Sequence, residues 1–306
     1  MNDSPADVQP ISLERTTAGE YCRAVQRATQ VEFWWYMGGL VGKRNRWKPF
    51  EDSSGRWWWH VKPRFAWPVD FFSPIPDAAS VHPSSGLLGW QHSVQPHEAN
   101  SHVRLNVIQD LSGYKLEAIE GKKRRWTIRK ALRELDYAVC DATDADVASQ
   151  ACEVWNSHVQ RTGWNKPMTT DEFRRSWHEL AAMPGTTVIT ARDRQSHALC
   201  AWLIGRVIDG TAFIDTLTSH TDRVAGGPND GLVFLYLISA AAMGIRHAHY
   251  GLHSKIESLE SFKKGLGFTP HAFPTRLHLR FPVGPLLRIL RPRDYKRLLG
   301  DENWST

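Results

Sequence analysis

Cysteine is scarce in this sequence and follows no metal-binding or redox pattern. Only four cysteines occur among 306 residues, and no two of them form a C-x-x-C pair. A zinc site or a disulfide framework is therefore not expected, and a reducing compartment fits this usage. No apolar run approaches the roughly 18 residues of a membrane span, and the polar N-terminal stretch lacks the apolar segment of a secretory signal peptide. We expect a cytoplasmic protein.

Negative charge is in the minority. The sequence holds 38 Lys and Arg against 32 Asp and Glu, which gives a net charge of +6 and a pI near 9.2. A basic protein favours acidic partners, which include phosphate, nucleotides, nucleic acid and anionic lipid. The excess is modest, so it is also compatible with a soluble enzyme that has no polyanion partner.

Regular periodicity is missing from the first third of the chain. Residues 1–20 are polar and predict a flexible tail, and residues 21–118 combine Trp-rich stretches with frequent Pro and Gly. Because proline breaks long elements, irregular strands joined by turns are expected here. The stretch "WWWH" (Trp57–His60) can stack on a sugar or a base, or it can build a core strand.

From residue 119 onward, hydrophobic periodicity and turn signals predict a regular order of elements. Three antiparallel strands, the last two joined by an Asp-Gly hairpin turn, should lead into a buried helix. The strand after this helix can pair in parallel with the third strand, which splays two neighbouring strands and opens a cleft. The predicted elements are a helix at 122–135, a strand at 137–142, helices at 144–160 and 170–183, strands at 186–192, 197–208 and 211–219, a helix at 231–244, a strand at 245–252 and a helix at 254–265.

Cap residues mark where these helices begin. Asp144 is expected to cap the second helix, and Thr169 with Glu172 to form a capping box before the third. In the first helix, Trp126 joins Ile128 in an apolar stripe that we expect to face the core.

The chain resembles the GNAT acyltransferase fold, and most closely its FemAB-like branch, over about residues 120–270. The resemblance is carried by a string of strands and by the ordered stretches "KRRWTIRKALRELDYAV", "GGPNDGLVFLYLISAAAMGIRHAHYGL" and "SLESFKKGLGF". It implies an α+β protein with a GNAT-like, mixed and mostly antiparallel sheet flanked by helices. Residues 119–280 would be the catalytic domain and 281–306 a basic amphipathic tail. Residues 21–118 would bind the acceptor or form a degenerate second copy of the fold.

The same resemblance implies an acyl or aminoacyl transferase. Such an enzyme moves the group by direct attack onto an amine or hydroxyl of a peptide, sugar or amino-sugar acceptor. The co-substrate would be aminoacyl-tRNA or acyl-CoA, with no permanently bound cofactor, and tRNA is a candidate partner of an expected monomer. The competing hypothesis is a non-catalytic module of the same fold that binds nucleic acid.

The loop before the buried helix is the candidate donor site. The usual acyl-CoA pyrophosphate loop reads Arg/Gln-x-x-Gly-x-Gly/Ala, whereas "RVAGGP" ends in Pro228 here. Free backbone N–H groups at a helix N-terminus bind phosphate, so Gly226, Gly227 and Asn229 are expected to contact the donor. A simple Gly/Pro turn with an Asn cap is the alternative.

Lys263 and Phe262 lie near the end of the short helix that follows the last predicted strand. Ser254 and Glu257 are expected to form a capping box at its start. The resemblance assigns Lys263 to donor or oxyanion stabilisation and Phe262 to shaping the pocket, because a fixed cation stabilises a tetrahedral oxyanion. Alternatively, Lys263 only complements the dipole at a helix C-terminus.

Three further residues are candidates for proton transfer or donor contact. Asp215, in the strand at 211–219, can accept the proton of an amine nucleophile, or can be an ordinary polar strand position. Tyr250 and His253, at the end of the next strand, can protonate a leaving group, and we also assign His253 to the donor site. No Cys or carboxylate joins the neighbouring histidines at a suitable spacing, so no metal site is expected.

Two basic stretches are candidate contact surfaces. Arg125 and Arg129 lie in the densest positive run and can contact the acceptor or tRNA, or can form a solvated helix face. The stretch at 282–300 is basic and amphipathic, so the C-terminal tail can rest on an anionic membrane surface or dock on its own domain.

Overall fold

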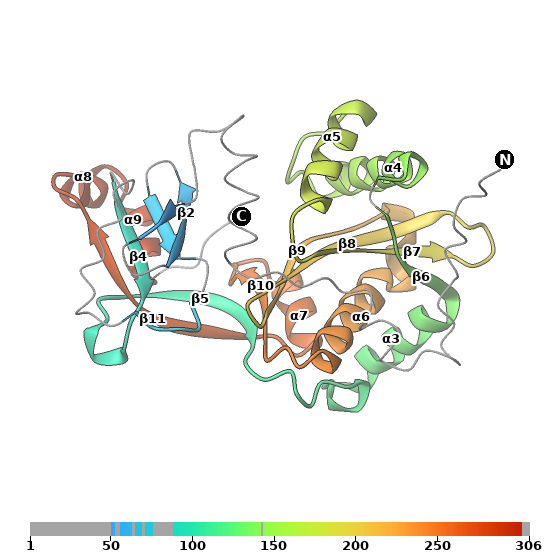
Figure 1. Ribbon diagram of the computed structural model, residues 1–306, viewed down its shortest axis with the longest axis horizontal. Coiled ribbons are helices and arrows are strands. Elements are labelled where there is room, and N and C mark those ends of the chain that lie inside the picture. The colour runs from blue at the N-terminus through green and yellow to red at the C-terminus, as the bar shows by residue number, and fades with distance from the viewer. Residues whose placement is uncertain are drawn as a thin grey trace. The chain divides into compact units, whose positions relative to one another are not determined.

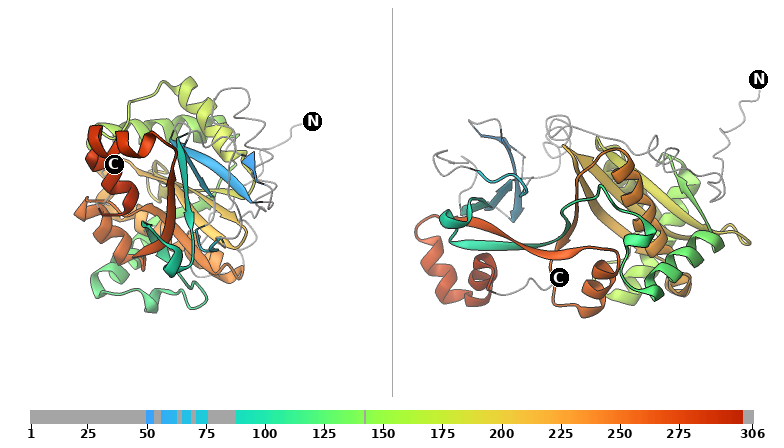
Figure 2. Two further views of the ribbon diagram at one scale, coloured as in Figure 1. Left: turned by 90° about the vertical axis from the view of Figure 1, so that its left-hand side faces the viewer. Right: turned by 90° about the horizontal axis from the view of Figure 1, so that it is seen from below.

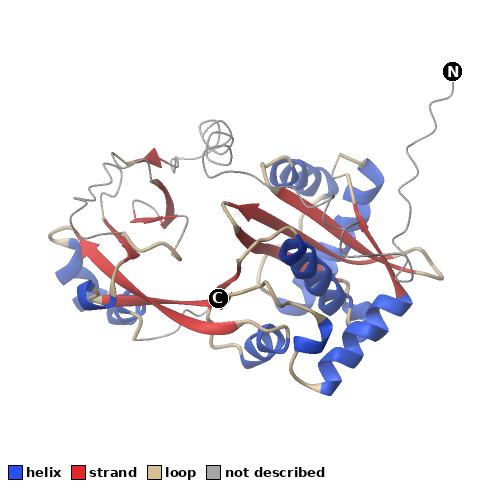
Figure 3. Cartoon of the chain, turned by 60° about the horizontal axis from the view of Figure 1, so that its bottom comes forward, coloured by secondary structure: helices blue, strands red, loops and turns tan. Residues whose placement is uncertain are grey.

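The computed structural model describes residues 50–52, 56–62, 65–68, 71–75, 88–141 and 143–301. The predicted flexible tail at 1–20 lies outside the described residues, as does much of the Trp-rich region; these appear in grey in Figure 3. The described chain forms two compact units, one of residues 108–250 and 262–268, the other of residues up to 107 with 251–261 and 269–301.

The first unit contains a five-stranded sheet with helices on both faces (Figure 1). Its strands follow the order β10-β9-β8-β7-β6, antiparallel from β6 to β9, with β10 parallel to β9. The predicted meander and the predicted parallel pair are thus confirmed. The strands are β6 (Leu135–Val139), β7 (Thr186–Asp193), β8 (Leu199–Ile208), β9 (Thr211–Ser219) and β10 (His247–Leu252).

The helices of this unit bury two separate cores. α3, α6 and α7 pack on one face of the sheet, and α4 and α5 on the other (Figure 1). α6 lies against the sheet and is buried nearly all round, as its uninterrupted apolar sequence predicted. The helices are α3 (Lys122–Glu134), α4 (Ala145–Thr162), α5 (Thr170–Ala181), α6 (Pro228–Ala242) and α7 (Glu257–Gly265).

Local capping explains where these helices begin. The Asp144 carboxylate accepts bonds from two first-turn N–H groups of α4, and Thr169 with Glu172 forms the predicted capping box of α5. The predicted position of Trp126 was wrong. Its side chain is 59% exposed, whereas Ile128 of the same helix is fully buried.

The second unit contains the sheet order β1-β2-β3-β4-β11-β5, with the pair β3–β4 parallel and the other pairs antiparallel. The strand β11 was not predicted from the sequence. It contains Pro270 and Pro274, and it pairs with β5 over Thr269–Thr275 and with β4 over Thr275–Leu279. The strands are β1 (Phe50–Glu51), β2 (Trp57–Lys62), β3 (Phe65–Pro68), β4 (Gly89–Ser93), β5 (Ser101–Ile108) and β11 (Thr269–Leu279).

The basic C-terminal stretch forms two helices, α8 (Val283–Leu290) and α9 (Pro292–Leu299), which contact each other (Figure 2). The break falls at Arg291 and Pro292, because proline has no N–H to continue the helix that precedes it. Across the described residues, no helix combines the length and the apolar sequence that crossing a bilayer requires.

Candidate functional site

The strands β9 and β10 pair only at their beginnings. Their parallel register comprises three residue pairs and ends at His249 opposite Phe213, although β9 continues to Ser219 and β10 to Leu252. On its other side, β9 stays paired with β8 up to Ser219. Beyond Phe213 the described structure therefore holds no further β9–β10 pair. The expected splaying of two neighbouring strands is present.

Asp215 lies at a bulge in β9 next to this parting. Ile204 of β8 pairs with Thr216 and Gly205 with Ile214, which leaves Asp215 as the extra residue of the bulge. Its carboxylate forms an ion pair with the guanidinium of Arg206. A bulge re-aims the residues that follow it, so the pair fixes the strand at the point where it leaves β10.

Arg206 is buried and is bound from three directions. Its Nε donates to Thr186 Oγ1 at 3.1 Å, its carbonyl accepts from the Tyr236 hydroxyl at 2.7 Å, and its guanidinium holds Asp215. Burial lowers the pKa of Arg206 to about 10, which leaves it charged at neutral pH. The sequence analysis did not single out this residue, because its partner is known only once β8 and β9 are in register.

Lys263 is 4% exposed, in contrast to its neighbour Lys264, which lies on the surface of α7. Its Nζ lies 5.3 Å from the centroid of the Tyr250 ring, within the range of a cation–π contact. The backbone carbonyl of Lys263 accepts from the N–H groups of Leu266 and Phe268, which closes the end of the helix. The structure thus turns this ammonium inward, toward the end of β10.

His249 is the residue that sequence reasoning missed. Its ring packs edge-on against Phe213 at 5.4 Å, at the last pair before the strands part. Its Nε2 is buried and has no hydrogen-bond partner among the described residues. Burial, and then the charge of Lys263, lowers the pKa of His249 to about 4, so the imidazole is neutral at pH 7. A neutral imidazole nitrogen without a partner can accept a hydrogen bond from a substrate group.

Tyr250 and Phe262 belong to one aromatic cluster. The Tyr250 ring lies edge-on to Phe262 at 6.5 Å and to Phe268 at 5.4 Å. Burial raises the pKa of Tyr250 well above its usual value, so its hydroxyl remains protonated. Tyr250, Phe262 and Lys263 therefore lie in one cluster, while the fourth catalytic candidate, Asp215, lies at the bulge in β9 and binds Arg206.

Arg124 of α3 ties this cluster to α6. Its guanidinium forms an ion pair with Asp230, in the first turn of α6, and lies 5.4 Å from the centroid of the Phe262 ring. A Cβ at Gly265 would lie 2.6 Å from Arg124 Nε, so the Arg124 side chain lies directly against the end of α7. Burial raises the pKa of Asp230, whereas the bond from Arg124 opposes that shift.

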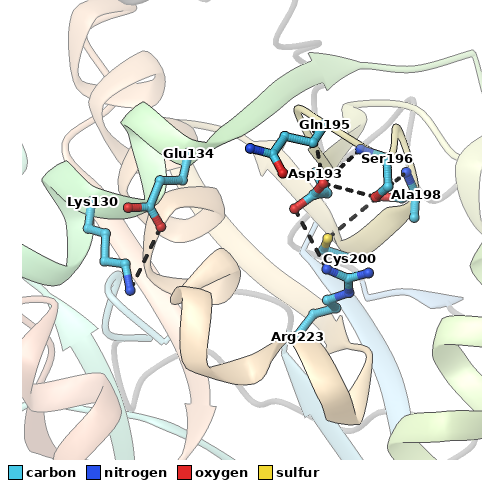
Figure 4. Close-up of polar contacts among 8 residues, drawn as sticks. All are labelled: Lys130, Glu134, Asp193, Gln195, Ser196, Ala198, Cys200 and Arg223. Carbon is cyan, nitrogen blue, oxygen red and sulfur yellow. Dashed lines mark hydrogen bonds and ion pairs between the residues drawn. The ribbon is translucent and has the colours of Figure 1, made fainter.

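The candidate donor loop is held by internal bonds. The Gly227 N–H donates to the Val224 carbonyl at 3.0 Å, and Arg223 forms an ion pair at 3.7 Å with Asp193 in the β7–β8 turn (Figure 4). Asn229 Nδ2 donates to Ser219 Oγ at the end of β9, and its Oδ1 is buried without a hydrogen-bond partner among the described residues. Gly226 is half-exposed beside it. The bond from Asn229 thus ties the start of α6 to the end of β9.

His253 belongs to the second unit and binds a carboxylate. Its Nδ1 lies 2.6 Å from Glu260, which also accepts from the Ser254 N–H and hydroxyl and from Asn106. The predicted capping box of Ser254 with Glu257 was wrong, because Ser254 reaches Glu260 instead and α7 begins at Glu257. Three bonds and one histidine make Glu260 the centre of a polar cluster that the sequence did not reveal.

The basic face of α3 is only partly neutralised. Arg125 donates to the Ile119 carbonyl at 2.6 Å, while Arg129 is exposed. Lys130 lies 3.7 Å from Glu134 on the same helix (Figure 4) and 5.5 Å from the ring centroid of the exposed Trp126. An exposed aromatic ring among cations is a feature of surfaces that bind single-stranded nucleic acid.

Metal ligands do not converge in the described part of the chain. No group of three or more His, Cys, Asp or Glu side chains there is arranged to hold an ion.

The sequence matches no protein-family model and no curated protein. Solved structures share its fold over almost their whole length. The C-terminal domain of a proposed lysylphosphatidylglycerol synthetase from Agrobacterium fabrum is 14% identical, with a TM-score of 0.55 over 94% of this chain and 99% of that one. L-PGS from Bacillus licheniformis is 13% identical, with a TM-score of 0.54 over 92% and 96%. FemX is 8% identical, with a TM-score of 0.55 over 92% and 99%. The chain therefore has the GNAT-type fold in its FemAB-like form.

Proposed function

We propose that the protein transfers an aminoacyl group from an aminoacyl-tRNA to an amine or hydroxyl acceptor, by direct attack in a ternary complex. The observation that carries this proposal is Lys263, a buried ammonium near the end of β10, where β9 and β10 part. Burying an ammonium group costs free energy, because the charge loses its contact with water. A lysine held in such a position therefore favours a functional role.

The reaction needs a group that stabilises negative charge. Attack on the activated carbonyl gives a tetrahedral oxyanion, and a fixed cation with backbone N–H donors stabilises it by several kcal/mol, on the order of 3. In this proposal Lys263 and N–H groups of β9 beyond Phe213 supply those donors, and Phe262 shapes the wall beside them. The bulge at Asp215 sets the direction of that part of β9.

Orientation of the acceptor is assigned to His249, and proton donation to Tyr250. The carboxylate of Asp215 is held by Arg206, whereas Nε2 of His249 has no partner among the described residues. Nε2 of His249 therefore accepts a hydrogen bond from the attacking group and orients it, solvent takes the proton released on attack, and Tyr250 gives one to the ribose oxygen of the leaving tRNA. Asp215 then acts through the bulge, as a positioning residue.

The choice of aminoacyl-tRNA over acyl-CoA rests on the donor loop and on α3. Pro228 stands where a pyrophosphate loop has Gly or Ala, Arg223 is engaged by Asp193, and the Gly227 N–H is engaged by Val224. The exposed Trp126 lies among cations on α3. A solved structure of the same fold is named for lysylphosphatidylglycerol, an aminoacyl ester, which is a precedent for this chemistry on the fold.

Replacing Lys263 by Met tests the proposal, since Met keeps the apolar stem and removes the charge. We expect transfer of radiolabel from bulk aminoacyl-tRNA into a deproteinised extract of peptides, sugars and amino-sugars to fall by about 10²–10³-fold. The variant should keep its far-UV circular dichroism, which checks that it folds.

Lys264→Met is the matched control, because Lys264 is the adjacent lysine of the same helix and is exposed. It should transfer as the wild type does. Full activity of the Lys263→Met protein would refute the proposal. A wild-type protein that binds tRNA but transfers no label from aminoacyl-tRNA or acyl-CoA would instead support the non-catalytic module.

A further inference from the structure

The helix α8 and Phe281, two residues before it, present large apolar side chains to solvent. Phe281 is 90% exposed, Ile289 75% and Leu290 72%. Leu286, Ile289 and Leu290 follow the i, i+3, i+4 spacing that places them on one helix face. We call these three residues and Phe281 the α8 patch.

The neighbouring helix α9 uses its leucines in the opposite way. Leu298 and Leu299 pack against the core of the second unit, and the Leu298 carbonyl accepts a bond from Gln91 at 2.9 Å. A Cβ at Gly300 would lie 2.5 Å from the His102 carbonyl oxygen, so the end of α9 is held directly against the sheet. Because α9 is anchored and contacts α8 (Figure 2), the α8 patch is held facing outward.

Positive charge surrounds the α8 patch. From Arg280 to Asp301 the chain has six Arg and Lys and two Asp, which gives a net charge of +4. Arg288, Arg291 and Arg293 are exposed. Large apolar side chains flanked by arginines on a short helix suit the boundary between headgroups and acyl chains, where the apolar groups insert and the guanidinium groups contact lipid phosphate.

We propose that the α8 patch docks the protein on an anionic bilayer surface. The proposal is independent of the transfer reaction, since the residues that carry it belong to the second unit. The four exposed side chains offer roughly 500 Å² of apolar surface, which is below the ~800 Å² per partner of a stable dimer interface. The excess of arginine complements anionic phosphate, whereas a second copy of the chain would bring the same charge to the contact.

The test measures sedimentation of the full chain with vesicles of phosphatidylcholine containing 30% phosphatidylglycerol. We expect the wild type to partition at least tenfold more strongly onto these vesicles than onto pure phosphatidylcholine, and to be released as salt rises. The double variant Ile289→Ser/Leu290→Ser should lose at least tenfold in partitioning. Because both residues are exposed, the variant should keep its far-UV circular dichroism and thermal midpoint.

Trp164→Ser is the control, since Trp164 is an exposed large residue outside the α8 patch; it should partition as the wild type does. Equal partitioning onto neutral and anionic vesicles would overturn the proposal, as would a double variant that binds like the wild type. Sedimentation equilibrium supplies a further outcome: a wild-type dimer that the double variant converts to a monomer would assign the α8 patch to self-association instead.

Discussion

At the scale of single residues, two buried cations of the first unit have different surroundings. The guanidinium of Arg206 binds the Asp215 carboxylate and donates to the Thr186 hydroxyl, so its charge is balanced by the pair across β8 and β9. Lys263 lies against an aromatic ring, and its charge helps to keep His249 neutral. Protonating His249 would place two positive charges close together. Lys263 and His249 therefore determine the protonation state of the site together.

The lowered pKa of His249 predicts a pH-dependent stability. With a pKa of about 4 in the folded state and the ordinary 6.5 when unfolded, the stabilisation is complete above pH 6.5 and is lost as the pH falls toward 4. The His249→Phe variant, which does not titrate there, should lose about 3 kcal/mol less than the wild type between pH 7 and pH 4. Urea unfolding at both pH values measures the difference.

Lys263→Met provides the companion measurement. Removing the ammonium deletes one of the two causes of the shift, while burial remains. The loss of stability between pH 7 and pH 4 should therefore be smaller than in the wild type. Identical pH profiles for the wild type and both variants would show that His249 is not a buried neutral base.

At the scale of elements, two adjacent glycines, Gly226 and Gly227, precede α6 and have different surroundings. Gly227 has a φ of +69°, and a Cβ there would lie 2.6 Å from Thr127 Cγ2 of α3. A Cβ at Gly226 would meet nothing within 4 Å, and its φ lies outside the left-handed region. The contact between α3 and α6 therefore tolerates a side chain at only one of the two positions.

We expect Gly227→Ala to lower the free energy of unfolding by about 2 kcal/mol, because it combines left-handed strain with a clash. Gly226→Ala should change it by less than about 0.5 kcal/mol. Urea denaturation of the two variants makes the comparison. Equal effects would mean that the close approach of α3 and α6 does not exist in solution.

At the scale of the whole molecule, the net charge of +6 is too small to identify a partner, and the placement of the charges matters more. The α3 face combines the exposed Arg129 with Trp126, whereas Arg125 is bound to a backbone carbonyl. Electrostatic binding to a phosphate backbone weakens with salt in proportion to the number of contacts. If tRNA is the donor, its affinity for the protein should therefore fall as the salt concentration rises.

Arg129→Glu should weaken tRNA binding several-fold at 50 mM salt and reduce the slope of log affinity against log salt by about 1. Filter binding over a salt series measures both. Arg175→Glu, at an exposed position of α5, is the matched control and should leave both unchanged. Stabilisation of the wild type by CoA together with an unaltered salt slope for Arg129→Glu would favour acyl-CoA as the donor.

Much of the first unit was predictable because its signals are local. Asp144, the Thr169–Glu172 capping box and the Asp-Gly turn at Asp209 act within a few residues, and each formed as expected. The predictions for Trp126 and Ser254 were wrong because both depend on contacts beyond the nearest neighbours in the sequence. The exposure of Trp126 depends on what covers α3, and Ser254 bonds to the more distant Glu260 rather than to Glu257.

The sequence by itself determined the order of the elements, their caps, and the presence of a lysine near the end of α7. These follow from periodicity and from hydrogen bonds between near neighbours. Only the tertiary structure decided that Lys263 turns inward beside Tyr250, that Arg206 binds Asp215, and that His249 lies where β9 and β10 part. Those contacts depend on strand register and on which face of a helix is covered, and both are set by packing between segments far apart in the chain.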